Sequence, residues 1–140
     1  SLMGGISFGN SDVAGIHCMA EAMGGLYDIP HGIANAILLT TVSEFNISAN
    51  EKKYAEVAEA LGVDIEGLSD SQAAERGIEM MEKLCKDVGI PNMREIEKIN
   101  PADFERLADA AANNVSAGSN PRKAGKKEYL ELFQKAYDKE

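Results

Sequence analysis

Two histidines are the side chains of this sequence best suited to chemistry. His17 and His31 are the only histidines among the 140 residues, and they flank the pair Gly24-Gly25. Glu21 follows His17 by four residues, which puts both side chains on one face of a helix. Neutral imidazoles suit Zn²⁺ or Fe²⁺, but two ligands do not make a tight metal site. The pattern predicts a partial metal site, with structural or incidental histidines as the alternative.

Two neighbouring helices would have to position these side chains. A first helix is expected from a cap at Ser11 or Asp12 to about Met23, where the glycine pair ends it. Pro30 begins the next helix, residues 31–45, which is apolar on nearly every side and is expected to be buried. The connection between the two helices is short, so the second helix folds back on the first and the two imidazoles can converge.

The rest of the chain predicts more helices and no sheet. Residues 1–10 are small and glycine-rich, which indicates an irregular lead-in, with Ser1-Leu2 as an addition before a native start at Met3. Apolar spacing and capping residues indicate four further helices: from Ala49 or Asn50 to residue 61, from Ser69, Asp70 or Ser71 to about residue 88, from residue 100 to about 113, and over residues 126–137. No run of alternating β-branched residues is present. We therefore expect one all-α domain over residues 11–140, a bundle of about six helices.

Composition excludes several classes of function. A net charge of −9 argues against a nucleic-acid partner, because a protein that binds phosphates needs positive charge. The apolar stretches are broken too often for a membrane span, and no charged-then-apolar leader begins the chain. Cys18 and Cys85 stand far apart without a CxxC pair, which is typical of reduced core thiols. These features predict a cytoplasmic protein.

The segment GIHCMAEAMGGLYDIPHGIANAILL, residues 15–39, resembles the signature of the iron-containing (group III) alcohol dehydrogenases. Later stretches are similar to landmarks of the same family: KYAEVAEALGV, IPNMREI and SNPR. The positions that match the signature are Gly15, His17, Ala20, Gly24, Pro30, His31, Gly32, Asn35 and Ala36. The resemblance covers most of the chain and implies the C-terminal helical domain of dehydroquinate-synthase-like and iron-containing alcohol dehydrogenases.

The resemblance also implies a site and a reaction. His17 and His31 match two of the family's metal ligands, for Fe²⁺ or alternatively Zn²⁺, in an enzyme that oxidises small alcohols or reduces aldehydes with NAD(P). The family's other two ligands, an Asp and a His, and its nucleotide-binding N-terminal domain lie upstream, and we expect them to be absent from these 140 residues. No residue here is assigned to the nucleotide. The chain alone is expected to be inactive.

Departures from the family pattern leave some questions open. Glu21 stands where the family usually has a second His near the reacting oxygen, so it is a candidate proton relay, a metal ligand beside His17, or a solvated residue. Without an upstream domain, apolar residues of the face around residues 1–31 are left uncovered, which predicts a homo-oligomer; these residues are Leu2, Ile6, Phe8 and Tyr27. The alternative functions are a glycerol-dehydrogenase-like or dehydroquinate-synthase-like zinc enzyme, and a free-standing helical interaction module.

Overall fold

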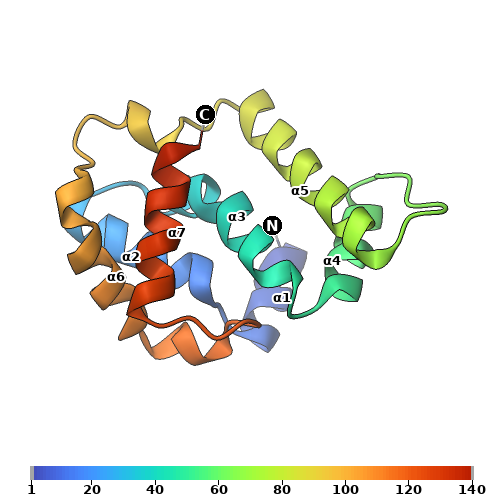
Figure 1. Cartoon of the computed structure of the whole chain (residues 1–140), viewed down its shortest axis with the longest axis horizontal. Helices are drawn as coiled ribbons and strands as arrows, with labels where there is room; N and C mark the ends of the chain where they lie inside the picture. Colours follow the sequence, from blue (N-terminus) through green and yellow to red (C-terminus); the bar gives the residue numbers. More distant parts are fainter. Residues whose placement is uncertain (1, 140) are drawn as a thin grey trace.

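Helices and their connections make up the whole computed structural model, which describes residues 2–139 (Figure 1). The α-helices are α1 (Leu2–Ser11), α2 (Gly15–Tyr27), α3 (His31–Ile47), α4 (Glu51–Ala60), α5 (Asp70–Asp87), α6 (Phe104–Ala112) and α7 (Lys126–Asp138). Three short 3-10 helices are η1 (Met93–Glu95), η2 (Pro101–Asp103) and η3 (Val115–Ser119). No strand occurs among these residues, so the all-α prediction is confirmed. Ser1 and Glu140, the ends of the predicted segments, lie outside the described residues.

Helix α3 runs through the middle of the molecule, as its apolar sequence predicts. It lies between the layer of α2, α6 and α7 and the hairpin of α4 and α5 (Figure 1). Four consecutive residues near its centre, 40–43, are all buried, so neighbours cover this helix on every side there. None of the described helices combines the length and the apolar character needed to cross a membrane.

The main core lies where α2 packs on α6 and α7. Met19 and Met23 of α2 are fully buried, together with Phe104 of α6 and Phe133 of α7. The two phenylalanine rings stack with centroids 5.9 Å apart. Each such side chain contributes roughly 1.5–3 kcal/mol when it leaves water. This packing holds α2, the helix that carries His17, against the rest of the protein.

Side-chain caps set the start of α4 and α5 at the predicted places. The side chain of Asn50 accepts a hydrogen bond from the Lys53 N–H and caps α4. Ser69 accepts from the Gln72 N–H, and the Gln72 side chain accepts in return from the Ser69 N–H. Such reciprocal bonds satisfy backbone N–H groups that the first turn of a helix leaves free. Both starts could be predicted because each cap is local.

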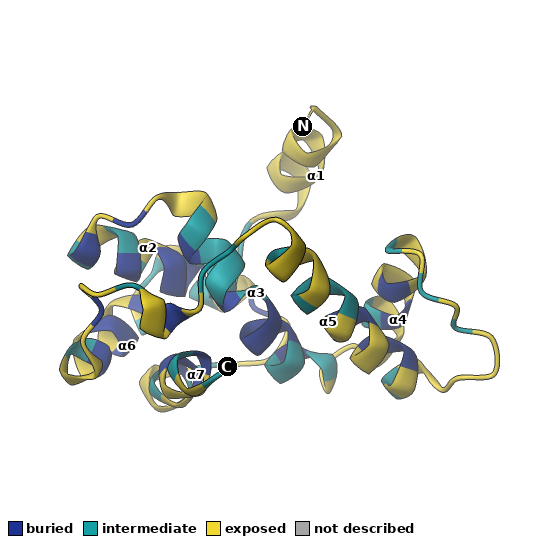
Figure 2. Cartoon of the chain, turned by 90° about the horizontal axis from the view of Figure 1, so that it is seen from above, coloured by how far each residue is buried: buried dark blue, intermediate teal, exposed yellow. Residues whose placement is uncertain are grey.

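The expected irregular lead-in is wrong, because residues 2–11 form helix α1. Glycines in a helix cost about 1 kcal/mol each relative to alanine, which was the reason to expect no helix. Two exposed side chains bond to the carbonyl four residues before them: Asn10 Nδ2 donates to the Ile6 carbonyl at 2.7 Å, and Ser11 Oγ donates to the Ser7 carbonyl at 2.9 Å. None of its residues is buried, and α1 projects from the other helices (Figure 2).

The predicted bounds of the first histidine-bearing helix are also wrong. Asp12 has a left-handed backbone, φ 67°, so it lies in the turn between α1 and α2. The helix then continues through Gly24-Gly25 to Tyr27, because burial of Met23 and Tyr27 on both sides of the pair outweighs the glycine cost. Asp28 ends it instead, with φ 52° and its N–H bonded to the Gly24 carbonyl. Tyr27, expected to be exposed, is 8% exposed.

Candidate metal centre

Both histidines lie in the first turn of a helix. His17 is the third residue of α2, and His31 is the first residue of α3. Backbone N–H groups at the start of a helix have no partner within it, so that end carries a partial positive charge. A side chain that offers a lone pair suits this end of a helix better than one that carries a positive charge.

The structure brings the two rings together. The ring centroids of His17 and His31 lie 5.3 Å apart, with 51° between the ring planes. Two imidazoles that share one tetrahedral ion at about 2.1 Å from each nitrogen have centroids roughly 5 Å apart. The spacing of the two rings is therefore compatible with two ligand positions of a Zn²⁺- or Fe²⁺-type site.

Burial favours the neutral form of the His17 imidazole. Removal of the ring from water is the main cause that lowers the pKa of His17, and the neighbouring His31 lowers it further, while Glu21 opposes the shift. His17 is therefore neutral at pH 7 and has a lone pair free for a ligand bond.

Asn35 fixes the orientation of the His31 ring. Its Nδ2 donates to the His31 carbonyl oxygen at 2.9 Å and lies 3.1 Å from His31 Nε2. In this arrangement the Asn35 N–H donates to Nε2 and occupies its lone pair, so a metal ion would bind this nitrogen only in place of that hydrogen bond. The Oδ1 of Asn35 is buried without a hydrogen-bond partner. Asn35 therefore restricts the orientation of the His31 ring through its contact with Nε2.

Glu21 is exposed and is held by a residue far away in the sequence. Its Oε2 accepts a hydrogen bond from Asn114 Nδ2 at 2.7 Å. Among residues 2–139, no three or more His, Cys, Asp or Glu side chains converge to hold a metal ion. The described residues thus supply two imidazoles and a carboxylate one helical turn from one of them, but no complete coordination sphere.

An open hollow of about 460 Å³ adjoins His17. Phe8 of α1, Ile16 of α2, and Tyr54 of α4 contribute apolar surface to its wall, and Asn46 and Asn120 contribute amides. The sequence does not predict this wall, because the glycine-rich residues 1–10 indicate an irregular segment and not the helix that contributes Phe8. Asn120 belongs to residues 114–125, which the sequence predicts as a loop; their Asn and Ser residues next to glycine indicate turns with side-chain bonds to nearby backbone, not the distant partner that Asn120 reaches.

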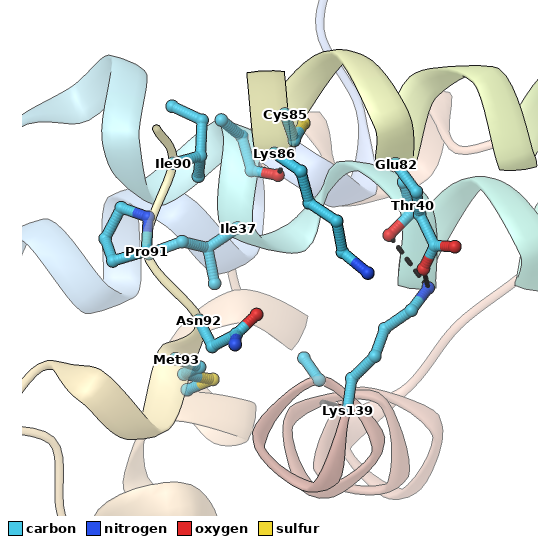
Figure 3. A pocket seen from close by; sticks show the side chains of 12 residues that line it. Ile37, Thr40, Glu82, Cys85, Lys86, Ile90, Pro91, Asn92, Met93 and Lys139 are labelled. Carbon is cyan, nitrogen blue, oxygen red and sulfur yellow. Dashed lines mark hydrogen bonds and ion pairs between the residues drawn. The ribbon is translucent and has the colours of Figure 1, made fainter. Parts of the chain in front are cut away.

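A second, smaller cavity lies away from the histidines. It measures about 60 Å³ and lies between α3, α5 and the end of α7 (Figure 3). Lys139 Nζ at its edge is already bonded to Glu82 Oε1 at 2.5 Å and Thr40 Oγ1 at 3.0 Å. Cys85, also in its wall, is half-buried, and burial raises the pKa of its thiol. Lys139, Glu82 and Thr40 are already paired with one another, so the histidine pair is the stronger candidate site.

Comparison with known proteins gives a consistent result. Residues 1–137 match the profile described as "Fe-containing alcohol dehydrogenase family, C-terminal". The chain is 42% identical over 137 residues to the 1,3-propanediol dehydrogenase of Citrobacter freundii, covering 98% of this chain and 35% of that protein. It is 37% identical over 134 residues to the lactaldehyde reductase of Escherichia coli (strain K12), covering 95% of this chain and 35% of that protein.

Solved structures of alcohol dehydrogenases contain the same fold. The structure of a 1,3-propanediol oxidoreductase has a TM-score of 0.94 and 41% sequence identity, covering 97% of this chain and 36% of that chain. An alcohol dehydrogenase from Oenococcus oeni has a TM-score of 0.90 and 40% identity, covering 95% of this chain and 35% of that chain. The 140 residues thus span about a third of the length of these relatives.

Proposed function

The chain belongs to the Fe-containing alcohol dehydrogenase family, and on that premise we propose that it is the metal-binding part of an NAD(P)-linked alcohol dehydrogenase. Small alcohols and their aldehydes are the proposed substrates, which the names 1,3-propanediol dehydrogenase and NAD-dependent methanol dehydrogenase among its relatives support. A bound divalent ion, Fe²⁺ or alternatively Zn²⁺, supplies a Lewis acid at the substrate oxygen, with NAD(P) as the hydride carrier.

The observation that carries this proposal is the contact between two imidazoles at the starts of two helices. His17 and His31, with ring centroids 5.3 Å apart, are the residues that hold the ion. Asn35 keeps the His31 ring in one orientation through its contact with Nε2. A ligand ring held in one orientation loses less freedom when the ion binds.

Glu21 is the proposed proton relay. It lies one turn from His17 on α2, and its carboxylate is exposed yet fixed by Asn114. A carboxylate in that position takes the proton that an alcohol releases on oxidation and returns one on aldehyde reduction. The hydrogen bond that Asn114 Nδ2 donates to Oε2 orients the carboxylate.

The remaining ligands and the nucleotide site come from protein outside these 140 residues in this proposal. Two observations support it: no three potential ligands converge among the described residues, and the chain spans 35% of its relatives. A cytoplasmic setting goes with it, because Cys18 and Cys85 are both free thiols. The family match favours this branch over a glycerol-dehydrogenase-like or dehydroquinate-synthase-like zinc enzyme and over a free-standing interaction module.

A chimera tests the proposal. This chain replaces the matching part of the Citrobacter freundii 1,3-propanediol dehydrogenase, to which it is 42% identical. We expect NAD-dependent oxidation of 1,3-propanediol by the metal-loaded chimera and no detectable turnover by its His31→Ala variant. The control is Ser69→Ala, which removes the cap of the distant helix α5. A folded, metal-loaded chimera without activity, or a His31→Ala variant that keeps it, would contradict the proposal.

A further inference from the structure

The helix that carries His17 has no cap of its own. Ala14, the residue before Gly15, lacks a side-chain oxygen, and no cap hydrogen bond forms from that position. The first N–H of α2 instead donates to the side-chain Oδ1 of Asn120, which is 3.2 Å away in space and 105 residues away in the chain. Asn120 therefore replaces the missing cap from outside the helix, two residues before His17.

The Asn120 side chain also binds the other histidine-bearing helix. Its Oδ1 accepts from Asn46 Nδ2 at 3.0 Å, and its Nδ2 donates to Asn46 Oδ1 at 2.8 Å and to the Arg122 carbonyl oxygen at 2.6 Å. Asn46 lies in the last turn of α3, the helix that begins at His31. Asn120 is 7% exposed, so all of these bonds form away from water and fix its geometry. One buried amide thus ties together both helices of the candidate site.

The contact between α2 and Asn120 requires glycine at position 15. A Cβ at Gly15 would lie 2.7 Å from Asn120 Oδ1 and 3.1 Å from its Cγ. Both atoms belong to a side chain that is held by four hydrogen bonds and cannot turn aside freely. The close approach of the α2 backbone to Asn120 therefore depends on both residues, glycine at position 15 and asparagine at position 120.

We propose that Asn120 is a positioning residue for the metal site. It holds the first turn of α2 against the end of α3, and so it sets where His17 stands relative to His31. This inference rests on the proposed metal-binding role of the two histidines. Loss of the cap frees the first turn, which contains His17, while the rest of α2 stays packed in the core.

The test uses the complete chain with ¹³C-labelled histidine, titrated with Zn²⁺ alone. Only two imidazole signals exist, since the sequence has two histidines. In the unmodified chain we expect a cross-ring nuclear Overhauser effect and a joint response of both signals to zinc with one binding constant. In Asn120→Ala we expect the cross-ring effect to disappear and zinc affinity to fall by about tenfold or more, as for other residues that orient a ligand.

Two further variants separate positioning from general stability. Asn120→Asp keeps the oxygen that accepts from Gly15 N–H but places a second, buried oxygen against Asn46 Oδ1 and the Arg122 carbonyl, so we expect it to lose the cross-ring effect although the side chain keeps its shape. Gly15→Ala attacks the same contact from the helix side and is expected to behave as Asn120→Ala does, which keeps the test valid if Asn120→Ala does not fold. Ser69→Ala, a cap lost from α5, is the matched control and should leave both signals unchanged.

Two results would overturn the proposal in distinguishable ways. If both signals of the unmodified chain respond to zinc and those of folded Asn120→Ala and Gly15→Ala respond identically, Asn120 does not position the site. If neither signal of the unmodified chain responds to zinc, the metal site itself fails, and the role of Asn120 fails with it.

Discussion

At the scale of single residues, each chemical group of the candidate site is oriented by an asparagine. Asn35 contacts His31 Nε2, Asn114 donates to the Glu21 carboxylate, and Asn120 caps the helix of His17. An amide can orient a neighbour without adding a charge that would compete for a cation or move the pKa of an imidazole. The site is therefore positioned by neutral groups, which leaves the charge of a metal ion to be balanced by its own ligands.

Glu21 gives the first prediction. In the chimera with the 1,3-propanediol dehydrogenase, Glu21→Gln should lower kcat by about a hundredfold, because the amide keeps the shape of the side chain but cannot carry the proton. Steady-state kinetics should show KM for the alcohol little changed. Glu21→His should recover much of kcat, since imidazole can relay a proton as well. An unchanged kcat in Glu21→Gln would mean that Glu21 is a solvated residue only.

At the scale of helices, the sequence predicts the bounds that local hydrogen bonds set. It does not predict the bounds that contacts between distant residues set. Asn50 and Ser69 begin α4 and α5 through bonds to residues three positions away, so the sequence alone located both starts. The extent of α2 depends on Tyr27, whose hydroxyl lies 3.0 Å from Asp103 Oδ2, a residue far away in the chain. No local pattern shows that a helix will pass through Gly24-Gly25 to reach such a partner.

The candidate site also combines features that local sequence indicates with contacts between residues far apart in the chain. Composition and spacing make His17 and His31 candidate ligands, the family resemblance implies their role, and the fold places their ring centroids 5.3 Å apart. The residues that orient them escaped sequence analysis, because the bonds of Asn114 and Asn120 span 93 and 105 residues. Polar loop residues can bond to many partners, and only the packed fold decides which of them they reach.

Lys139 gives a prediction for the packing of α7. Its Nζ lies 2.5 Å from Glu82 Oε1 and 3.2 Å from Glu44 Oε1, at the junction of α3 and α5. The three side chains are only 28–33% exposed, so Lys139→Met should lower the free energy of unfolding at pH 7 by about 1 kcal/mol. Lys127→Met, which removes an exposed pair 3.9 Å apart, should change it little. Urea unfolding measures both, and equal effects of the two variants would contradict this account.

The effect of Lys139→Met should also depend on pH. Burial alone would raise the pKa of Glu44, but Lys135 and Lys139 outweigh burial and hold that pKa below its ordinary value of 4.5. A carboxylate with a lowered pKa stabilises the fold above 4.5, and this contribution disappears as the pH falls through the pKa of the folded state. Unfolding curves at about pH 3 should therefore show a smaller difference between Lys139→Met and the unmodified chain than at pH 7. A difference that grows in acid would contradict the assignment.

At the scale of the whole molecule, α1 leaves an apolar surface uncovered. Leu2, Ile6 and Phe8 are 77%, 58% and 60% exposed, on a helix with no buried residue. Tyr27, expected on the same surface, belongs to the core instead. Because uncovered apolar patches favour association, we predict that the isolated chain self-associates through α1 and that the Ile6→Ser/Phe8→Ser variant is monomeric. Sedimentation that shows a monomer at high concentration for the unmodified chain would contradict this prediction.

The incomplete site makes a prediction about activity. The described residues offer two imidazole ligands and no converging set of three or more, so the 140-residue chain should not turn over short alcohols with NAD or NADP, even with metal supplied. Absorbance of the reduced nicotinamide during incubation with 1,3-propanediol measures this directly. Steady turnover that His31→Ala abolishes would show that the chain forms a complete active site by itself.

Calorimetric titration of the 140-residue chain with Zn²⁺, and with Fe²⁺ under anaerobic conditions, tests most directly that His17 and His31 form half of a metal site. Two imidazoles with centroids 5.3 Å apart can chelate one ion but leave its coordination sphere unfilled. We predict one ion per chain, bound more weakly than micromolar, with the binding lost in His31→Ala. Submicromolar binding abolished by His31→Ala would contradict the half-site and indicate Glu21 as a third ligand. Weak binding unchanged in His31→Ala would contradict the histidine pair itself.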